Sequence, residues 1–451
     1  MLRIKTQMKK LLLLALFLLG LLPLLLFGNT FLTQTDSVAA MMMHDLKEQK
    51  AQTVIVGSSM ALYHMNPTII GKATGRSTFT AAVTGLMPPG AIALTKELLR
   101  HSQPEEIVLV LESGSFDTTK EDPMTQMKLA PFLSDPLNRL RYWYDTAQED
   151  GMYAERLLMM NSFGHRDAQD VRKSLRLRFD HEDASADILR EWTGEYAYDN
   201  GHLRIVGAEP VDAEDAQDWF IRRDTGMYYE VMPRTKEWLL RYRDLCHAHG
   251  VRLRVVIAPE MTATVLREAE RLTYLDSAQA FFAEAGIPCY NMLYAKESLL
   301  PDLNAYYHDY HHMTGEGADI LSAAVGRVLA EADAGQDVSG HFSRNRYAYL
   351  ESIRFMTNVW ATMEQRGGQI ALHADSNRGA SVQPEYSFAL VHPDGEETTL
   401  RSFGKNPDFS FDPAAHTPRK GSRIRVYGRA PGRAEVFRYD LPLDAAEGTA
   451  M

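Results

Sequence analysis

The chain has 451 residues, of which 45% are hydrophobic and 24% charged, and its formal net charge at pH 7 is −11. This length predicts two or three domains, and the composition is that of a globular protein with a large core. The acidic balance, without a long basic block, argues against a nucleic-acid partner, which needs a positive face. Cys246 and Cys289 stand in apolar contexts without a CxxC motif, which favours two buried free thiols over a single bridge.

The N-terminus carries a membrane signal. Basic residues at positions 3, 5, 9 and 10 precede an apolar run over residues 11–27, which is near the lower length limit for a membrane-spanning helix. We expect residues 1–28 to be an uncleaved transmembrane anchor with its N-terminus in the cytoplasm. A cleaved signal peptide is the alternative, because residues 37–40 offer a small-residue site. On either interpretation the globular part lies outside the cytoplasm, in the cell envelope, after a polar stalk over residues 29–52.

Short apolar runs and helical patterns alternate through residues 53–333. Continuous apolar runs bounded by glycine or proline favour buried parallel strands, and the intervening segments carry apolar residues at helical spacing. This order predicts an α/β domain with a three-layer, mainly parallel sheet. Residues 118–230 lack strand periodicity and predict a largely helical insertion, and Thr314 is the expected N-cap of the domain's last helix. The expected strands are 53–57, 79–85, 107–111, 251–259 and 287–290, and the expected helices are 91–100, 235–249, 264–285 and 314–332.

The composition changes after residue 333, which predicts a second domain over residues 334–451. Residues 347–365 have a helical pattern, and the Gly-Gly pair at 367–368 is expected to end that helix. Farther on, short alternating runs are separated by turn residues such as those at 393–395. This pattern is typical of a small antiparallel β-sandwich.

The first predicted strand ends at Gly57, and two serines follow before a helix-like segment. In open α/β sheets ligands bind at the carboxyl edge of the strands, and glycine lets the chain turn sharply there. Ser59 is expected at the start of a helix, where free N–H groups and the positive dipole end favour a developing negative charge. It is therefore a candidate nucleophile with part of its oxyanion hole built in. The alternative is a turn whose serines only cap the helix. His64, close after Ser59, could line the site, but we expect it on the polar surface of that helix.

A second polar motif lies over residues 306–318, just before the last helix of the α/β domain. Asp309 and His312 are three residues apart, so in a turn the carboxylate can accept the Nδ1 hydrogen of the imidazole. That bond fixes the tautomer and leaves Nε2 free to take a proton from a hydroxyl. Two alternatives remain: a zinc site that uses His308, His311 and His312, and a structural loop without chemistry.

Together these motifs resemble the SGNH/GDSL hydrolase superfamily over residues 50–332. The third residue of a Gly-Ser-Ser block matches the nucleophile of that family, which implies Ser59. Gly85, after the second strand, matches the glycine whose N–H contributes to the oxyanion hole. The closing DxxH block implies Asp309 and His312 as the remaining members of a catalytic triad. The resemblance also implies a flavodoxin-like α/β fold.

One block departs from the family pattern. After the third strand the family has Gly-x-Asn-Asp, whose asparagine completes the oxyanion hole, whereas this chain has Glu112, Ser113, Gly114 and Ser115. Ser113 is the expected substitute donor, with Ser115 or a backbone amide as alternatives. One such donor typically contributes about 2.7–4 kcal/mol of transition-state stabilisation. The departure therefore bears on hydrolytic efficiency rather than on the fold.

A Gly-Ser-Ser block behind a membrane anchor is similar to the envelope acyl-transfer branch of the superfamily, which includes the D-alanyl transfer protein of teichoic-acid modification and enzymes that O-acetylate polysaccharides. The resemblance implies a Ser-His-Asp enzyme that passes an acyl group, through an acyl-enzyme, to a glycan hydroxyl or to water. It implies no metal and no cofactor, and a membrane-bound O-acyltransferase as partner. The alternative is a non-catalytic envelope scaffold that binds a glycan or that acyltransferase.

Overall fold

Five parallel strands form the central sheet of the first domain in the computed structural model, which describes residues 2–32, 37–116, 118–158, 196–207, 229–267, 270–309, 311–433 and 436–443. The strands lie in the order β2-β1-β3-β6-β7, and every neighbouring pair is parallel. Numbered within this sheet alone, that is the order 2-1-3-4-5 of flavodoxin-like folds. The predicted α/β class is confirmed. The strands are β1 (Thr53–Gly57), β2 (Thr78–Ala82), β3 (Glu106–Leu111), β6 (Arg252–Ile257) and β7 (Cys289–Asn291).

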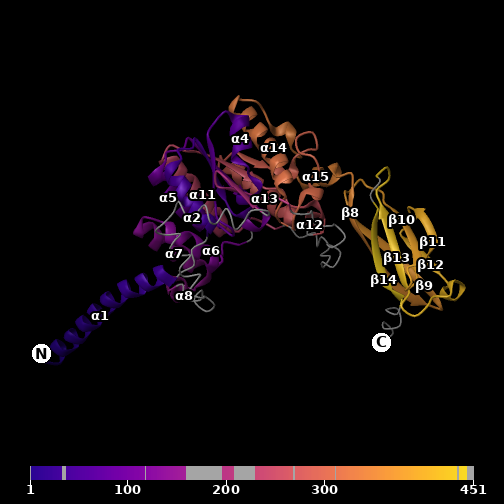
Figure 1. Ribbon diagram of the computed structural model, residues 1–451, viewed down its shortest axis with the longest axis horizontal. Coiled ribbons are helices and arrows are strands. Elements are labelled where there is room, and N and C mark those ends of the chain that lie inside the picture. The colour runs from indigo at the N-terminus through magenta and orange to yellow at the C-terminus, as the bar shows by residue number, and fades with distance from the viewer. Residues whose placement is uncertain are drawn as a thin grey trace.

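Helices cover both faces of this sheet, which makes the predicted three layers (Figure 1). Alternate residues of β1 separate the two faces: Val54 and Val56 belong to one apolar cluster, and Ile55 belongs to the other. The helices on the Val56 face are α2 (Ser37–Glu48), α5 (Pro88–His101), α11 (Pro233–Ala248) and α13 (Glu270–Glu284). The helices on the Ile55 face are α3 (Ser59–His64), α4 (Pro67–Thr74) and α14 (Gly315–Asp333).

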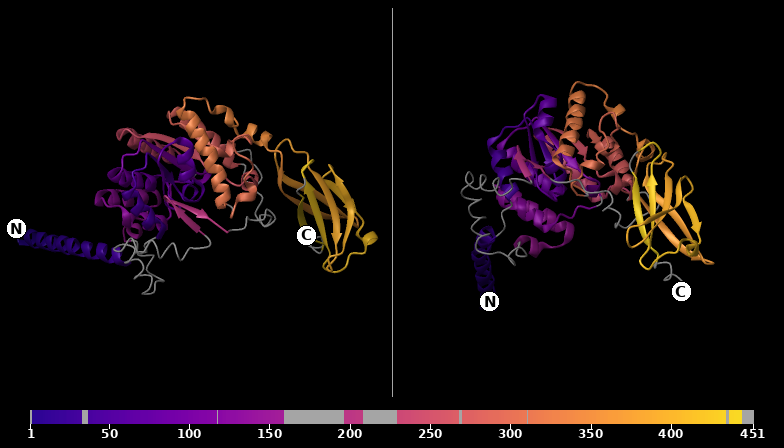
Figure 2. Two further views of the ribbon diagram at one scale, coloured as in Figure 1. Left: turned by 45° about the horizontal axis from the view of Figure 1, so that its top comes forward. Right: turned by 45° about the vertical axis from the view of Figure 1, so that its right-hand side comes forward.

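The helix α1 (Leu2–Leu32) precedes the α/β domain and extends away from it (Figure 2). Large apolar side chains along it, such as Leu11, Phe17 and Leu19, are exposed. Among the residues that the structure describes, no helix meets the combined length and hydropathy needed to cross a membrane.

The stalk expected over residues 29–52 is wrong for residues 37–48, which form α2. Met42, Met43 and Leu46 are buried in the core cluster of the α/β domain. These three residues lie on one helical face because they are separated by one, three and four positions. The methionine-rich patch is therefore the apolar stripe of a packed helix.

The insertion before β6 is helical at its beginning, as predicted. It starts with α6 (Pro123–Leu129), α7 (Pro136–Asp150) and α8 (Tyr153–Leu158). A two-stranded hairpin of β4 (Tyr196–Asp199) and β5 (His202–Ile205) follows, which the sequence did not predict. The prediction for residues 159–195 and 208–228 lies outside the described residues. After β6 the chain forms α12 (Thr262–Arg267) before α13, where one helix was expected.

Two antiparallel sheets form the second domain and enclose one apolar core, so the predicted β-sandwich is confirmed. One sheet has the order β11-β10-β13-β14 and the other the order β12-β9-β8. The elements are α15 (Arg346–Ser352), β8 (Met356–Arg366), β9 (Gln369–Arg378), β10 (Glu385–Val391), β11 (Glu397–Gly404), β12 (Asp408–Phe411), β13 (Arg423–Arg429) and β14 (Phe437–Pro442).

The helix predicted over residues 347–365 is wrong beyond residue 352. Residues 356–366 form β8, which pairs with β9 along its whole length. Gly367 and Gly368 have φ angles of 59° and 85°, and two positive values are what the two-residue turn of a hairpin requires. The glycine pair therefore joins two strands instead of ending a helix.

Candidate active site at the carboxyl edge of the sheet

The turn after β1 places Ser59 at the carboxyl edge of the sheet. A Cβ on Gly57 would lie 2.7 Å from the carbonyl oxygen of Val110 and 2.9 Å from Cβ of Ala61, so only glycine fits there. Ser58 is the N-cap of α3, and its Oγ accepts a hydrogen bond from the N–H of Met60 at 3.4 Å. Ser59 is the first helical residue and is partly exposed. The predicted strand, turn and helix are thus confirmed around this serine.

Asp309 and His312 form the hydrogen-bonded pair that their spacing predicts. The Asp309 Oδ2 and His312 Nδ1 atoms are 2.8 Å apart, and Oδ1 accepts the backbone N–H groups of His311 and His312 at 2.8 and 2.7 Å. Burial opposes ionisation of Asp309, but these hydrogen bonds outweigh it and hold its pKa well below the usual value. Asp309 is therefore a carboxylate, His312 carries its hydrogen on Nδ1, and Nε2 is the nitrogen left to accept a proton.

His312 packs against the helix that begins at Ser59. The rings of His312 and Tyr63 are 4.9 Å apart at an angle of 67°. Tyr63 lies four residues after Ser59, which places both on one face of α3. The structure therefore brings the serine-bearing helix and the histidine to the same edge of the sheet.

His64 joins the same two segments, and its expected surface position is wrong. Its side chain is fully buried, and its Nε2 accepts the N–H of Met313 at 3.0 Å. Burial and the nearby His312 lower the pKa of His64 to about 3. The imidazole is therefore neutral, with its hydrogen on Nδ1, and it fixes the residue next to His312. Sequence reasoning missed this role because the contact joins positions far apart in the chain.

Two backbone N–H groups are available near Ser59. Gly85 follows β2 with a φ of 75°, and a Cβ there would lie 2.5 Å from Thr125 Oγ1. In the part of the chain that the structure describes, neither the Gly85 N–H nor the Ser59 N–H has a hydrogen-bond partner. Such free donors at a turn and at a helix start are the groups that stabilise an oxyanion.

The residues after β3 form an acidic cluster with Glu260, at the position where the SGNH/GDSL sequence pattern has an asparagine. Ser113, the expected donor, gives its N–H to Glu260 Oε1 at 3.3 Å, and its Oγ lies 3.5 Å from a guanidinium nitrogen of Arg271. Its backbone amide is therefore occupied, and only its hydroxyl remains a predicted donor. Glu112 Oε1 lies 3.5 Å from Ser58 Oγ, at the long limit of a hydrogen bond.

Glu112 is the titratable group of this cluster with a perturbed pKa. Burial and the charge of Glu260 raise its pKa, against the opposing effects of His312, Ser58 and Arg271. A carboxyl group whose pKa is raised keeps its proton to higher pH and can then donate a hydrogen bond.

A small cavity of about 130 Å³ lies between α2, α3 and the turn after β2. Its walls include Leu62 and Tyr63, which lie three and four residues after Ser59 on the same helical face. Thr84, which precedes Gly85, forms another wall, and the remaining lining residues are mostly small and apolar. The cavity therefore adjoins both the serine-bearing helix and the candidate oxyanion donor.

The described ranges contain no set of ligands for the alternative zinc site. Among them, no three or more His, Cys, Asp or Glu side chains lie close enough together to hold a metal ion. The two cysteines are free thiols, with Cys246 buried and Cys289 partly so.

No protein-family model matches the chain, and no curated protein matches it. Among solved structures it is similar to a protein provisionally named an acylhydrolase, from Bacteroides fragilis, with 12% identity and a TM-score of 0.29 over 68% of this chain and 93% of the other. It is also similar to a GDSL-like lipase from Bacteroides thetaiotaomicron, with 11% identity and a TM-score of 0.30 over 66% of this chain and all of the other, 100%. Both likenesses are distant, so the chemistry of the site rests on its own geometry.

Proposed function

We propose that the protein is an SGNH-type serine enzyme that cleaves an acyl ester and passes the acyl group to a glycan hydroxyl or to water. One observation carries this proposal: the Asp309–His312 pair, 2.8 Å apart, lies against the helix whose first residue is Ser59. A serine nucleophile is activated by an oriented imidazole within hydrogen-bond reach of its hydroxyl. The packing of His312 on Tyr63 brings such an imidazole to the helix that carries Ser59.

The proposed reaction has two halves. Ser59 Oγ attacks the acyl carbonyl carbon while His312 Nε2 takes its proton, and the N–H groups of Gly85 and Ser59 hold the oxyanion. The tetrahedral intermediate collapses, its leaving oxygen receives the proton from His312, and the acyl group remains on Ser59. An acceptor hydroxyl or water then attacks the acyl-enzyme and gives its proton to His312, and Ser59 is regenerated. Asp309 orients the imidazole throughout.

The small cavity beside α3 favours a short acyl group. A volume of about 130 Å³ holds a few carbon atoms, and Leu62 and Val83 close it with apolar surface. A long fatty acyl chain would need a groove that continues from it. We therefore propose an acyl group of the size of acetyl, bound with its methyl group between α3 and the turn after β2.

We also propose that the enzyme works at a membrane, outside the cytoplasm. The exposed apolar residues of α1 and the basic residues before them favour insertion of the N-terminus into a bilayer. A soluble donor of activated acyl groups is not expected outside the cytoplasm, so a membrane-bound O-acyltransferase is the proposed partner that delivers the acyl group. The alternative is a non-catalytic scaffold that binds this acyltransferase. The absence of an asparagine after β3 favours that alternative.

Hydrolysis of 4-nitrophenyl acetate by the full chain in detergent tests the proposal. Ser59→Ala should abolish turnover, because it removes the attacking oxygen. Ser58→Ala is the matched control: it removes a capping hydroxyl, which costs about 1 kcal/mol of stability, but it leaves the nucleophile. Turnover that survives Ser59→Ala would contradict the assignment. Two results together would favour the scaffold: the wild-type chain shows no turnover, and the Ser59→Ala chain still restores polysaccharide modification.

A further inference from the structure

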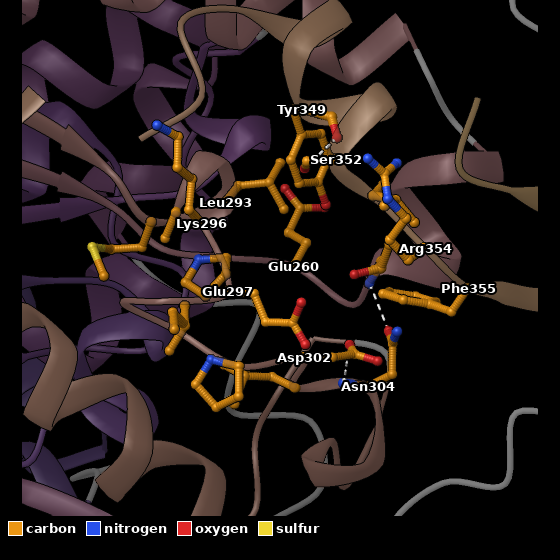
Figure 3. Close-up of a pocket in the computed structure, with 18 of the residues that line it drawn as sticks. Glu260, Leu293, Lys296, Glu297, Asp302, Asn304, Tyr349, Ser352, Arg354 and Phe355 are labelled. Atoms are coloured by element: carbon orange, nitrogen blue, oxygen red, sulfur yellow. Dashed lines mark hydrogen bonds between the residues drawn. The ribbon is translucent and has the colours of Figure 1, made fainter. Parts of the chain in front are cut away.

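A second and larger cavity lies at the same edge of the sheet, beyond β6 and β7. Its volume is about 420 Å³, within the range of about 300–1,000 Å³ that small-molecule sites occupy. Three segments line it: the residues after β6, the loop after β7 and the joint between α15 and β8, with Arg433 from the β-sandwich at its margin. Figure 3 shows the side chains of Glu260, Glu297 and Asp302 around the space between these segments.

Aromatic faces and oxygen atoms share the walls of this cavity. Tyr349 and the half-buried Phe355 line one side. The Tyr349 ring is fixed by stacking on Tyr294, at 5.3 Å and 28°. Glu297 is exposed and has no hydrogen-bond or ion-pair partner within the described ranges, so its carboxylate is available to a ligand. Asn304 is held in place because its Oδ1 accepts the N–H of Thr262 at 2.8 Å.

The charges of the cavity do not favour a polyanion. Glu260 is already engaged, because Oε2 forms an ion pair with Arg271 and Oε1 accepts the N–H of Ser113. The carboxylates of Glu297 and Asp302 also line the cavity, beside three cations, of Lys296, Arg354 and Arg433. Two of those cations are engaged: Lys296 donates to the carbonyl of Gly340 at 2.8 Å, and Arg354 donates to the carbonyl of Glu351 and to Ser381. An uncharged ligand that two carboxylates and the amide of Asn304 can recognise beside an aromatic ring is a polyhydroxylated one.

The cavity is connected to the candidate active site through shared residues. Glu260 lines the cavity and accepts the N–H of Ser113 after β3, in the cluster that contains Glu112. The loop after β7 supplies Asn304 and Tyr307 to the cavity and continues directly to Asp309. A chain molecule bound in the cavity would therefore lie along the edge that leads to His312.

We propose that this cavity binds a neutral sugar residue of a glycan, with the ring stacked on Phe355 and its hydroxyls hydrogen-bonded to Glu297 and Asp302. Its use as the acceptor subsite rests on the proposed acyl transfer, whereas sugar binding itself does not. The site adjoins the β-sandwich at the joint between α15 and β8. A hydrogen bond from the Gly379 N–H to the carbonyl oxygen of Phe355, at 3.2 Å, holds this joint.

The test is saturation-transfer NMR with the full chain in detergent and four neutral tetrasaccharides, of β-1,4-glucose, α-1,4-glucose, mannose and N-acetylglucosamine. At least one should bind saturably, and Phe355→Ala and Glu297→Gln should each weaken its binding at least tenfold. Glu297 is exposed, so its variant tests the site without threatening the fold. Tyr347→Ala is the matched control, because Tyr347 is an exposed aromatic residue on α15 outside the cavity lining.

The outcomes separate this proposal from the proposed enzyme. Ser59→Ala should bind the tetrasaccharide as the wild type does, even though it is expected to lose turnover. If none of the four sugars binds, or if binding is unchanged in both cavity variants, the sugar site is overturned. Tighter binding of an anionic tetragalacturonate than of all four neutral sugars would also overturn it. If the chain binds the sugar but is never acylated on Ser59, the enzyme proposal alone is overturned and the sugar site stands.

Discussion

The two ends of the same parallel sheet carry buried charges in opposite ways. At the amino end, Glu106 is fully buried and its carboxylate meets three guanidinium groups, of Arg252 at 2.9 Å, Arg76 at 3.0 Å and Arg254 at 3.1 Å. Asp333, at the end of α14, joins the same arginines and completes the network. Each charged group of this network has at least one oppositely charged partner.

At the carboxyl end the polar groups are held without full compensation. Glu112 has a raised pKa beside a second carboxylate, and His64 is buried with no partner for its Nδ1 in the described part of the chain. The N–H groups of Ser59 and Gly85 are likewise without partners there. Buried groups that keep unused hydrogen-bonding capacity cost stability, and such sites persist where they serve a ligand. The amino end of the sheet therefore serves the stability of the fold, and the carboxyl end holds the candidate site.

The largest expected effect is on activity, at the carboxyl end. Asp309→Asn should lower kcat for 4-nitrophenyl acetate on the order of 10⁴-fold, because an amide no longer holds His312 in the required tautomer. The thermal midpoint should also fall, because the charged hydrogen bond to His312 that lowers the pKa of Asp309 is lost, so kcat is taken per folded molecule. A loss of less than tenfold would show that the Asp309–His312 pair does not orient a catalytic base.

The next effect is on stability, at the amino end. Glu106→Gln should destabilise the α/β domain by about 3 kcal/mol, because three guanidinium groups are then left to share the single carboxylate of Asp333. Activity per folded molecule should stay at the wild-type level. Thermal unfolding and an active-site titration measure the two quantities, and Asp394→Asn, in an exposed ion pair of the β-sandwich, should leave the midpoint unchanged. A Glu106→Gln chain with normal stability but impaired turnover would reverse the assignment of the two ends.

A smaller effect is expected on acyl-chain preference. Val83→Ala should enlarge the cavity beside α3. The ratio of kcat/KM for 4-nitrophenyl butyrate to that for the acetate should then rise by about tenfold, which is the discrimination that a pocket for one methylene group typically gives. Val108→Ala is the control, since Val108 is equally buried in β3 but does not line this cavity. An equal change in both variants would mean that loosened packing, and not the cavity, sets the preference.

The smallest effect is a pH-dependent change in stability at Glu112. Its pKa is raised in the folded chain, so the neutral carboxyl contributes stability that is complete below the unfolded pKa of about 4.3 and is lost as pH rises through the folded pKa. Glu112→Gln cannot ionise. Its thermal midpoint should therefore match the wild type near pH 4 and exceed it near pH 8. A difference between the two chains that is the same at both pH values would contradict the raised pKa.

Local signals explain what the sequence predicted. The run from Thr53 to Ser59, the cap at Thr314 and the spacing of Asp309 and His312 each act within a few residues, and the structure has all three arrangements. Short-range geometry dictates each of them, because a turn, a cap or a hydrogen bond between residues three apart needs no distant partner.

Long-range contacts explain what it missed. His64 is buried because a loop 249 positions away covers it, and Glu112 meets Glu260 only once β3 and β6 pair. The Gly-Gly pair at 367–368 fits both a helix end and a hairpin turn, and pairing with β9 decides for the hairpin. In each case the local sequence is compatible with more than one structure, and contacts with distant residues decide which one forms.

The central claim is that Ser59 is the nucleophile, and a fluorophosphonate tests it most directly. The full chain is treated with the reagent and digested, and the modified residue is located by peptide mass spectrometry. A single phosphonyl adduct on Ser59, absent when His312 is replaced by alanine, is the predicted result. An adduct on Ser58 or on another residue, or no adduct under conditions that label a serine esterase, would contradict it.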